Sequence, residues 1–226
     1  MGKALQHMAN LLVEVGIVEP ESSANVNEAA TALIRQGNKT AWTYQLDLAR
    51  PIIFAPVKHP RHGSIHPRIA AHISVKEGED AHPPFELLKL ALEITDKSGE
   101  RIQRWHVDRA NKAGQQYQEG PLYHLQIGGH SRGGDRSLEV DLEEPRWCHP
   151  PLDIVLLAEV VAANFYPKEW RVLHAKGTWC SLVQESQKLC FTDYVKRMSD
   201  LMNVGQSTAL AEMWAETWAA STQNKE

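Results

Sequence analysis

The fold is decided by residues 88–108, which read LKLALEITDKSGERIQRWHVD. Apolar residues stand at positions 88, 90, 92 and 94, and Lys89 and Glu93 stand between them. This period of two is typical of a strand with one buried face. The run Asp96–Gly99 has turn chemistry, so we expect the strand to fold back onto 102–108 as an antiparallel hairpin.

Similar periods of two occur on both sides of this hairpin, at 42–48, 69–75 and 123–127. We expect proline- and glycine-rich loops at Pro51–Pro67 and Gly78–Pro84. Together these patterns predict a central antiparallel sheet of about five strands within residues 42–128.

Helical patterns flank the sheet. Residues 1–37 are expected to form two helices, with Gly16 ending the first, Pro20–Ala24 connecting them and Asn27 capping the second. The segment Leu152–Phe165 is apolar nearly all round, which predicts a buried core helix with Asp153 at its amino end. Shorter helices should follow within 150–220. The sequence thus predicts an α+β fold in a single domain, 1–226.

Composition narrows the functional classes. Lys and Arg total 24 against 28 Asp and Glu, so the net charge of −4 does not favour a polyanion, and nucleic acid is expected to bind only locally. The three cysteines form no C-x-x-C pair, which favours a reducing compartment. The first residues lack a signal-peptide pattern and no stretch is long enough to span a bilayer, so we expect a cytoplasmic protein.

Common catalytic signatures are missing from the sequence: no phosphate-binding loop, dinucleotide fingerprint, H-E-x-x-H motif or nucleophile elbow occurs. The leading hypothesis is therefore a non-catalytic interaction or accessory protein, with no cofactor. A terminal amphipathic helix capped by Ser207 provides the expected protein-binding surface, formed by Leu210, Met213, Trp214 and Trp218. Intramolecular docking of this stripe on Leu152–Phe165 is the preferred alternative.

A histidine–carboxylate constellation supports a competing enzyme hypothesis. The pleat places His106 and Asp108 on the face opposite Trp105 and Val107, and pairing with 123–127 would add His124 to them. With His130 these residues could bind a divalent metal or form an acid/base pair, as in a metal-dependent hydrolase or nuclease. A solvated polar sheet face explains the same residues.

Two further segments carry weaker signals. His59, His62 and His66 have helical metal-ligand spacing, but Pro60, Gly63 and Pro67 disfavour a helix, so a basic loop is expected there. Lys58, Arg61 and Arg68 are the candidates for local phosphate contacts.

Cys148 precedes the predicted core helix, and the dipole of a helix can lower the pKa of a thiol at its amino end. This position predicts a reactive thiol. The alternative is that Cys148 is a buried, unreactive core residue.

Two resemblances accompany these patterns. The motif H-x-D-x-x-N at His106–Asn111, followed by His124 and Gln126, resembles small bacterial toxin–antitoxin proteins. It implies an accessory role in a multi-gene system of the toxin–antitoxin or defence type. The order of helix, antiparallel meander, loop and core helix resembles the ubiquitin-conjugating fold, in which Cys148 would be the candidate for thiol chemistry.

Overall fold

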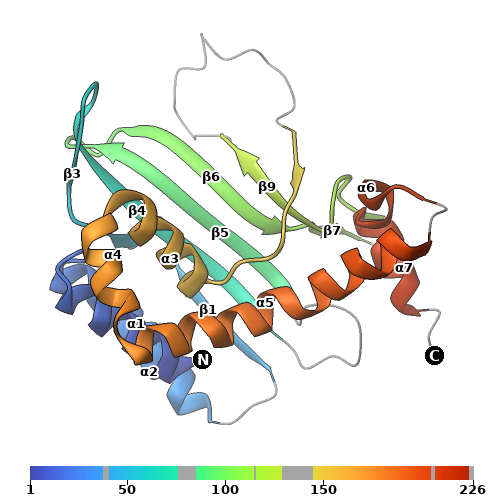
Figure 1. Cartoon of the computed structure of the whole chain (residues 1–226), viewed down its shortest axis with the longest axis horizontal. Helices are drawn as coiled ribbons and strands as arrows, with labels where there is room; N and C mark the ends of the chain where they lie inside the picture. The colour runs from blue at the N-terminus through green and yellow to red at the C-terminus, as the bar shows by residue number, and fades with distance from the viewer. Residues whose placement is uncertain (38–40, 76–84, 115, 129–144, 205–206, 224–226) are drawn as a thin grey trace.

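The computed structural model describes residues 1–37, 41–75, 85–114, 116–128, 145–204 and 207–223 (Figure 1). The helices within these ranges are α1 (Gly2–Glu14), α2 (Pro20–Gln36), α3 (Ile154–Phe165), α4 (Pro167–His174), α5 (Gly177–Val204), α6 (Ala209–Glu212) and α7 (Ala215–Gln223). The strands are β1 (Trp42–Leu46), β2 (Ile52–Ile53), β3 (Val57–His59), β4 (Gly63–Val75), β5 (Phe85–Asp96), β6 (Arg101–Arg109), β7 (Lys112–Ala113), β8 (Gln116–Tyr117), β9 (Tyr123–Ile127) and β10 (Trp147–Cys148).

The main sheet is antiparallel, in the order β1-β4-β5-β6-β9-β10, with β2 and β3 also paired to β4. The α+β prediction is therefore confirmed, and short edge strands extend the five predicted ones. The predicted hairpin joins β5 to β6 in the register Leu90↔Val107. Its turn is closed by the Asp96 carboxylate, which accepts hydrogen bonds from the backbone N–H groups of Ser98 (2.8 Å) and Glu100 (2.9 Å).

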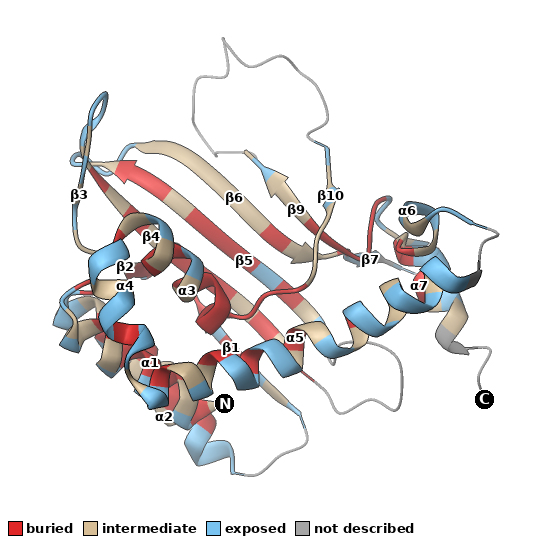
Figure 2. Cartoon of the chain, in the orientation of Figure 1, coloured by how far each residue is buried: buried red, intermediate tan, exposed pale blue. Residues whose placement is uncertain are grey.

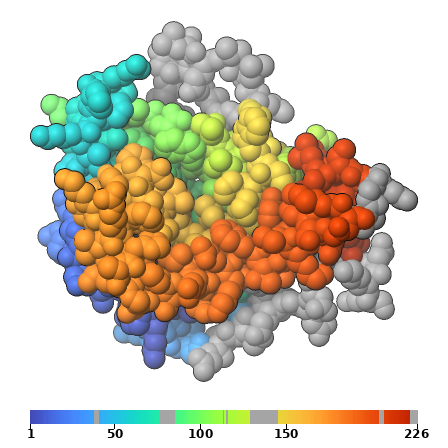
Figure 3. Space-filling model, in the orientation of Figure 1, coloured from blue at the N-terminus to red at the C-terminus, as the bar shows by residue number. Residues whose placement is uncertain are grey.

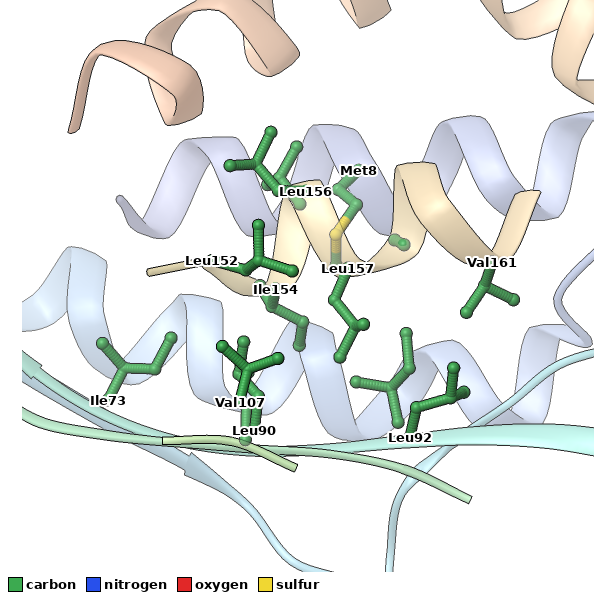
Figure 4. Close-up of a cluster of buried hydrophobic side chains, with 14 of the residues drawn as sticks. Met8, Ile73, Leu90, Leu92, Val107, Leu152, Ile154, Leu156, Leu157 and Val161 are labelled. Atoms are coloured by element: carbon green, nitrogen blue, oxygen red, sulfur yellow. The ribbon is translucent and has the colours of Figure 1, made fainter. Parts of the chain in front are cut away.

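Helix α3 packs on one face of the sheet, which we call the inner face (Figure 4). Ile154, Leu157 and Val161 of α3 point toward the apolar side chains of β4, β5 and β6, whereas Leu156 points to the α1 side of the helix. The inner-face residues drawn are Ile73, Leu90, Leu92 and Val107. Because side chains alternate along a strand, the residues between them form the opposite, outer face.

Burial confirms the predicted core helix (Figure 2). Helix α3 begins at Ile154, two residues later than predicted, and Asp153 caps it by accepting a hydrogen bond from the Leu156 N–H (2.9 Å). The Asp153 side chain is itself buried, and burial raises the pKa of its carboxyl.

Three local predictions are wrong. Helix α2 begins at Pro20, because proline suits a first helical turn, and Asn27 lies inside it. The expected loop Pro51–Pro67 instead contains β2, β3 and the start of β4, whose pairing satisfies the backbone there. In the C-terminal part, α4, α6 and α7 are short, as predicted, but between them lies the 28-residue helix α5, which was not expected. The expected loop Gly78–Pro84 lies outside the described residues.

The terminal stripe also differs from the prediction. Thr208 rather than Ser207 caps α6, and the helix is interrupted before α7. Residues 213–215 pair with 120–122: the Leu122 N–H donates to the Met213 carbonyl and the Ala215 N–H to the Gly120 carbonyl, both at 2.9 Å.

The aromatic part of the stripe docks on its own chain. Trp218 is buried against Tyr123 and Tyr194, with ring centroids 5.6 and 6.0 Å apart. Docking within the chain is thus confirmed, but next to β9 and α5 instead of on α3. No helix in the described part of the chain is long and apolar enough to cross a membrane.

Candidate functional site

The outer face of the sheet carries the histidine–carboxylate constellation. Asp108 of β6 is opposite His124 of β9 in the antiparallel register, and His106 is opposite Gln126. The strand pairing on which this constellation depends is therefore present. His106 Nδ1 lies 3.9 Å from Asp108 Oδ2, which is too long for a hydrogen bond that would orient the imidazole.

Asp108 has an unusual environment for a carboxyl group. Burial raises its pKa to about 6, although the positive charges of Lys89, Arg104 and Arg146 oppose the shift. Its Oδ1 atom is buried and accepts no hydrogen bond from the described residues. A carboxyl group with a pKa near neutrality can exchange protons at physiological pH, as a general acid or base must.

His124 is shifted in the opposite sense. It is buried, and burial lowers its pKa to about 4, helped by the charge of Arg146. Its Nδ1 lies 3.1 Å from the Pro121 carbonyl oxygen, which can only accept a hydrogen bond. The proton of the neutral ring is therefore on Nδ1, and Nε2 keeps its lone pair.

Arg146 links the two shifted groups. Its side chain crosses Gly120, where an added Cβ would approach Arg146 Cδ to 3.0 Å, and its guanidinium donates to the Glu119 carbonyl. Gly120 has a φ of +133°, a conformation that other residues rarely adopt. The positive φ favours a glycine here, and any other side chain would also require Arg146 to shift.

The predicted metal site is only partly assembled. Among the residues that the structure describes, no group of three or more His, Cys, Asp or Glu side chains is placed to hold a metal ion. His106 and Asp108 lie near each other, and His124 is in register with Asp108. The fourth predicted ligand, His130, lies outside the described ranges, so metal binding stays a prediction.

Cys148 lies in β10 and is half-buried, with its Sγ 3.1 Å from the Tyr194 hydroxyl oxygen. The amino end of α3 is five residues further along the chain and is capped by Asp153. The argument for an activated thiol thus loses the helix-end position on which it depended. Thiol chemistry stays a prediction, and it requires Cys148 to react with an alkylating reagent near neutral pH faster than an unperturbed thiol.

The three histidines of the basic segment lie in the β3–β4 hairpin. His59 Nδ1 accepts from the backbone N–H groups of Arg61 and His62, both at 3.3 Å, and so helps to close the turn. His66 is placed further along β4 on the outer face, because it pairs with Thr95 and alternates with the buried Ile65. The prediction that these histidines do not form a helix is confirmed.

A pocket that the sequence did not predict opens between α3 and the inner face. It has a volume of about 320 Å³ and is lined by Leu90, Leu92, Trp105, Val107, Leu125, His149, Leu152, Leu157, Val160, Asn164 and Phe165. We call it the apolar recess. In Figure 3 the strands of this region remain visible beside the helices and the segment that precedes α3.

Exposed apolar residues occur at the apolar recess and at positions paired with residues that line it. Val160, which lines it, is 42% exposed. Trp147 is 60% exposed and pairs with the lining residue Leu125, and Ile127 is 46% exposed and pairs with Trp105. Val160, Trp147 and Ile127 form what we call the apolar rim.

Sequence reasoning also missed Glu159 of α3. Its Oε1 accepts from Trp170 Nε1 (2.9 Å) and lies 2.8 Å from His174 Nε2, and its Oε2 accepts from Trp179 Nε1 (2.6 Å). One carboxylate thereby joins α3, α4 and α5. The residues are far enough apart in sequence that no spacing signal identified them.

Comparison of the chain with protein-family models, curated proteins and solved structures finds no match.

Proposed function

We propose that the protein is a non-catalytic interaction protein, an accessory subunit that binds a partner protein at the apolar recess. The observation that carries this proposal is the combination of the recess with the apolar rim of Trp147, Val160 and Ile127. Single exposed apolar residues are ordinary, but several around one concave apolar site are typical of interaction surfaces.

The rim favours a protein over a small ligand. A recess of about 320 Å³ is at the lower end of the range for small-molecule sites. A small ligand that filled it would leave the rim in water, whereas a partner that inserts one apolar anchor would also cover Trp147 and Val160. Buried aromatic anchors dominate the binding free energy of protein interfaces.

The experiment places a photo-crosslinking amino acid at position 147 and, as a control, at position 202, where Met202 is 76% exposed on α5. A partner should crosslink from 147 and not from 202. With that partner purified, Val160→Asp should weaken binding by at least tenfold, and Met202→Asp should leave it unchanged. Equal effects of the two substitutions, or crosslinking only from 202, would contradict the proposal.

Asp108 supports a second candidate, the metal-dependent hydrolase or nuclease. A buried carboxylate oxygen without a hydrogen-bond donor, next to His106, is what an unfilled ligand position would provide. Elemental analysis of protein purified without added metal tests it. Near-stoichiometric zinc, iron or manganese that is lost in Asp108→Asn favours the enzyme, and metal-free protein argues against it.

A further inference from the structure

Positively charged residues are concentrated on the outer face, although the chain as a whole has a net negative charge. Strand register places Lys58 and Arg68 there from β3 and β4, and Lys89, Arg101 and Arg104 from β5 and β6. We call these five residues the cationic face. The carboxylates that the register places on the outer face of β5 and β6 are Glu93 and Asp108, so the cations placed there outnumber the acids by five to two. The whole chain, in contrast, has a net charge of −4.

The arginines of this face are incompletely neutralised. Glu93 lies 3.4 Å from Arg104 and 3.7 Å from Arg101, so one carboxylate is shared between two guanidinium groups. The Nε atom of Arg68 is buried and forms no hydrogen bond with the described residues, whereas Arg104 Nε is the atom that lies 3.4 Å from Glu93. Buried donors without acceptors are costly, and an anionic oxygen would supply the missing partner.

The face is accessible at β1, β3 and β5. Lys58 and Lys89 are exposed, as are Thr43 and Gln45 on the outer side of β1. Histidines lie among the cations: His66 and His72 are on the outer face of β4, where their partners are Thr95 and Lys89. A sheet surface that combines guanidinium groups with flat imidazole rings can bind phosphates and also stack against bases.

We infer that the cationic face binds a single-stranded polynucleotide. Arginine recognises phosphate through paired hydrogen bonds, which favours a phosphodiester chain over a carboxylate-rich polypeptide. A broad sheet face does not enter the major groove of a duplex as a helix or a two-stranded ribbon does, which favours a single strand. This inference goes beyond the proposed function, because it uses the face opposite the apolar recess.

The test is fluorescence anisotropy of labelled 20-nucleotide RNA and DNA strands, titrated with the intact protein at several salt concentrations. Engagement of three to five phosphates predicts a slope of log K against log salt of about −2 to −3.5. The double substitution Lys58→Glu and Lys89→Glu should weaken binding at least tenfold. Both residues are exposed, so the variant should fold, which its circular dichroism spectrum verifies.

The matched control is Lys188→Glu with Lys196→Glu on α5, which changes the net charge equally at side chains that are 71% and 67% exposed. This control should bind like the wild type. No binding at low salt, an equal loss in the control, tighter binding of a duplex, or equal displacement by polyglutamate would each overturn the inference. A preference between the RNA and DNA strands identifies the type of polynucleotide.

Discussion

The two faces of the sheet are made by the same strands but have opposite chemistry. On β5, Leu90 and Leu92 lie on the inner face and pack under α3, whereas Lys89 and Glu93 lie on the outer face among arginines and histidines. On the inner face, the apolar packing is interrupted at the apolar recess. On the outer face, the groups with unusual environments are ionisable side chains, such as Asp108. We therefore expect substitutions on the inner side to change stability and those at the rim or on the outer face to change binding or pH dependence.

The largest effect on stability is expected at Trp218, which is fully buried and packs against Tyr123 of β9. Trp218→Ala should lower the free energy of unfolding by about 3–5 kcal/mol, because it leaves a large cavity. Denaturant unfolding followed by circular dichroism measures this. Leu210→Ala, at a residue of the same stripe that is 52% exposed, should stay within about 0.5 kcal/mol. Equal midpoints would show that the C-terminal segment does not dock as described.

The second effect concerns pH and the outer face. The folded-state pKa of Asp108 is raised from 3.8 to about 6, so its contribution lowers stability as pH rises through that interval. The pKa of His124 is lowered from 6.5 to about 4, so its contribution raises stability between pH 4 and 6.5. In the wild type the two contributions largely offset each other.

Single substitutions should separate these contributions. Relative to the wild type, His124→Asn should lose on the order of 2–3 kcal/mol of unfolding free energy between pH 4 and pH 6, and Asp108→Asn should gain a similar amount. Urea unfolding at both pH values measures the difference. If both variants keep the wild-type pH profile, burial does not shift these two groups as described.

A smaller effect is expected at Glu159, which joins three helices on the inner side. Glu159→Gln replaces one acceptor oxygen by a donor amide and leaves an indole N–H, such as that of buried Trp179, without an acceptor. The expected loss is about 2 kcal/mol. Glu185→Gln, at a side chain that is 73% exposed on α5, serves as the control and should be neutral. A neutral Glu159→Gln would mean that water replaces the lost acceptor.

The smallest effect is expected at Trp147 in the apolar rim. Trp147→Ala should change the unfolding free energy by less than about 1 kcal/mol, because the side chain is 60% exposed. The same substitution should abolish binding of the partner protein, measured by calorimetry. A loss of stability comparable to that of Trp218→Ala would show that Trp147 is part of the core and would remove it from the proposed surface.

Much of the fold could be predicted because the inner face repeats every second residue. The alternation at 88–94 and the turn at Asp96–Gly99 identified β5, β6 and their antiparallel pairing. The errors occurred where local signals compete. Asn27 has the chemistry of a helix cap, but Pro20 starts the helix earlier. The prolines near β2 and β3 indicated a loop, whereas these segments form strands because they pair with β4.

The candidate sites were less accessible to prediction. From the pleat, Asp108 and His124 could be assigned to one face if their strands paired, and the structure shows that β6 and β9 pair with these two residues opposite each other. The apolar recess depends on how far α3 extends over β6 and β9, which is a tertiary property without a local pattern. The cationic face likewise required the register of four strands before Lys58, Arg68 and Arg104 could be assigned to one surface.

The pairing of 213–215 with 120–122 has a consequence for folding during synthesis. Residues 120–122 leave the ribosome well before 213–215, so the Leu122 N–H must first hydrogen-bond to water. Until Trp218 has also been made, one side of the Tyr123 ring stays uncovered. This end of the sheet therefore forms late, and its formation has the entropic cost of closing a long loop. A nascent chain halted before residue 213 would expose the Tyr123 ring to chaperones.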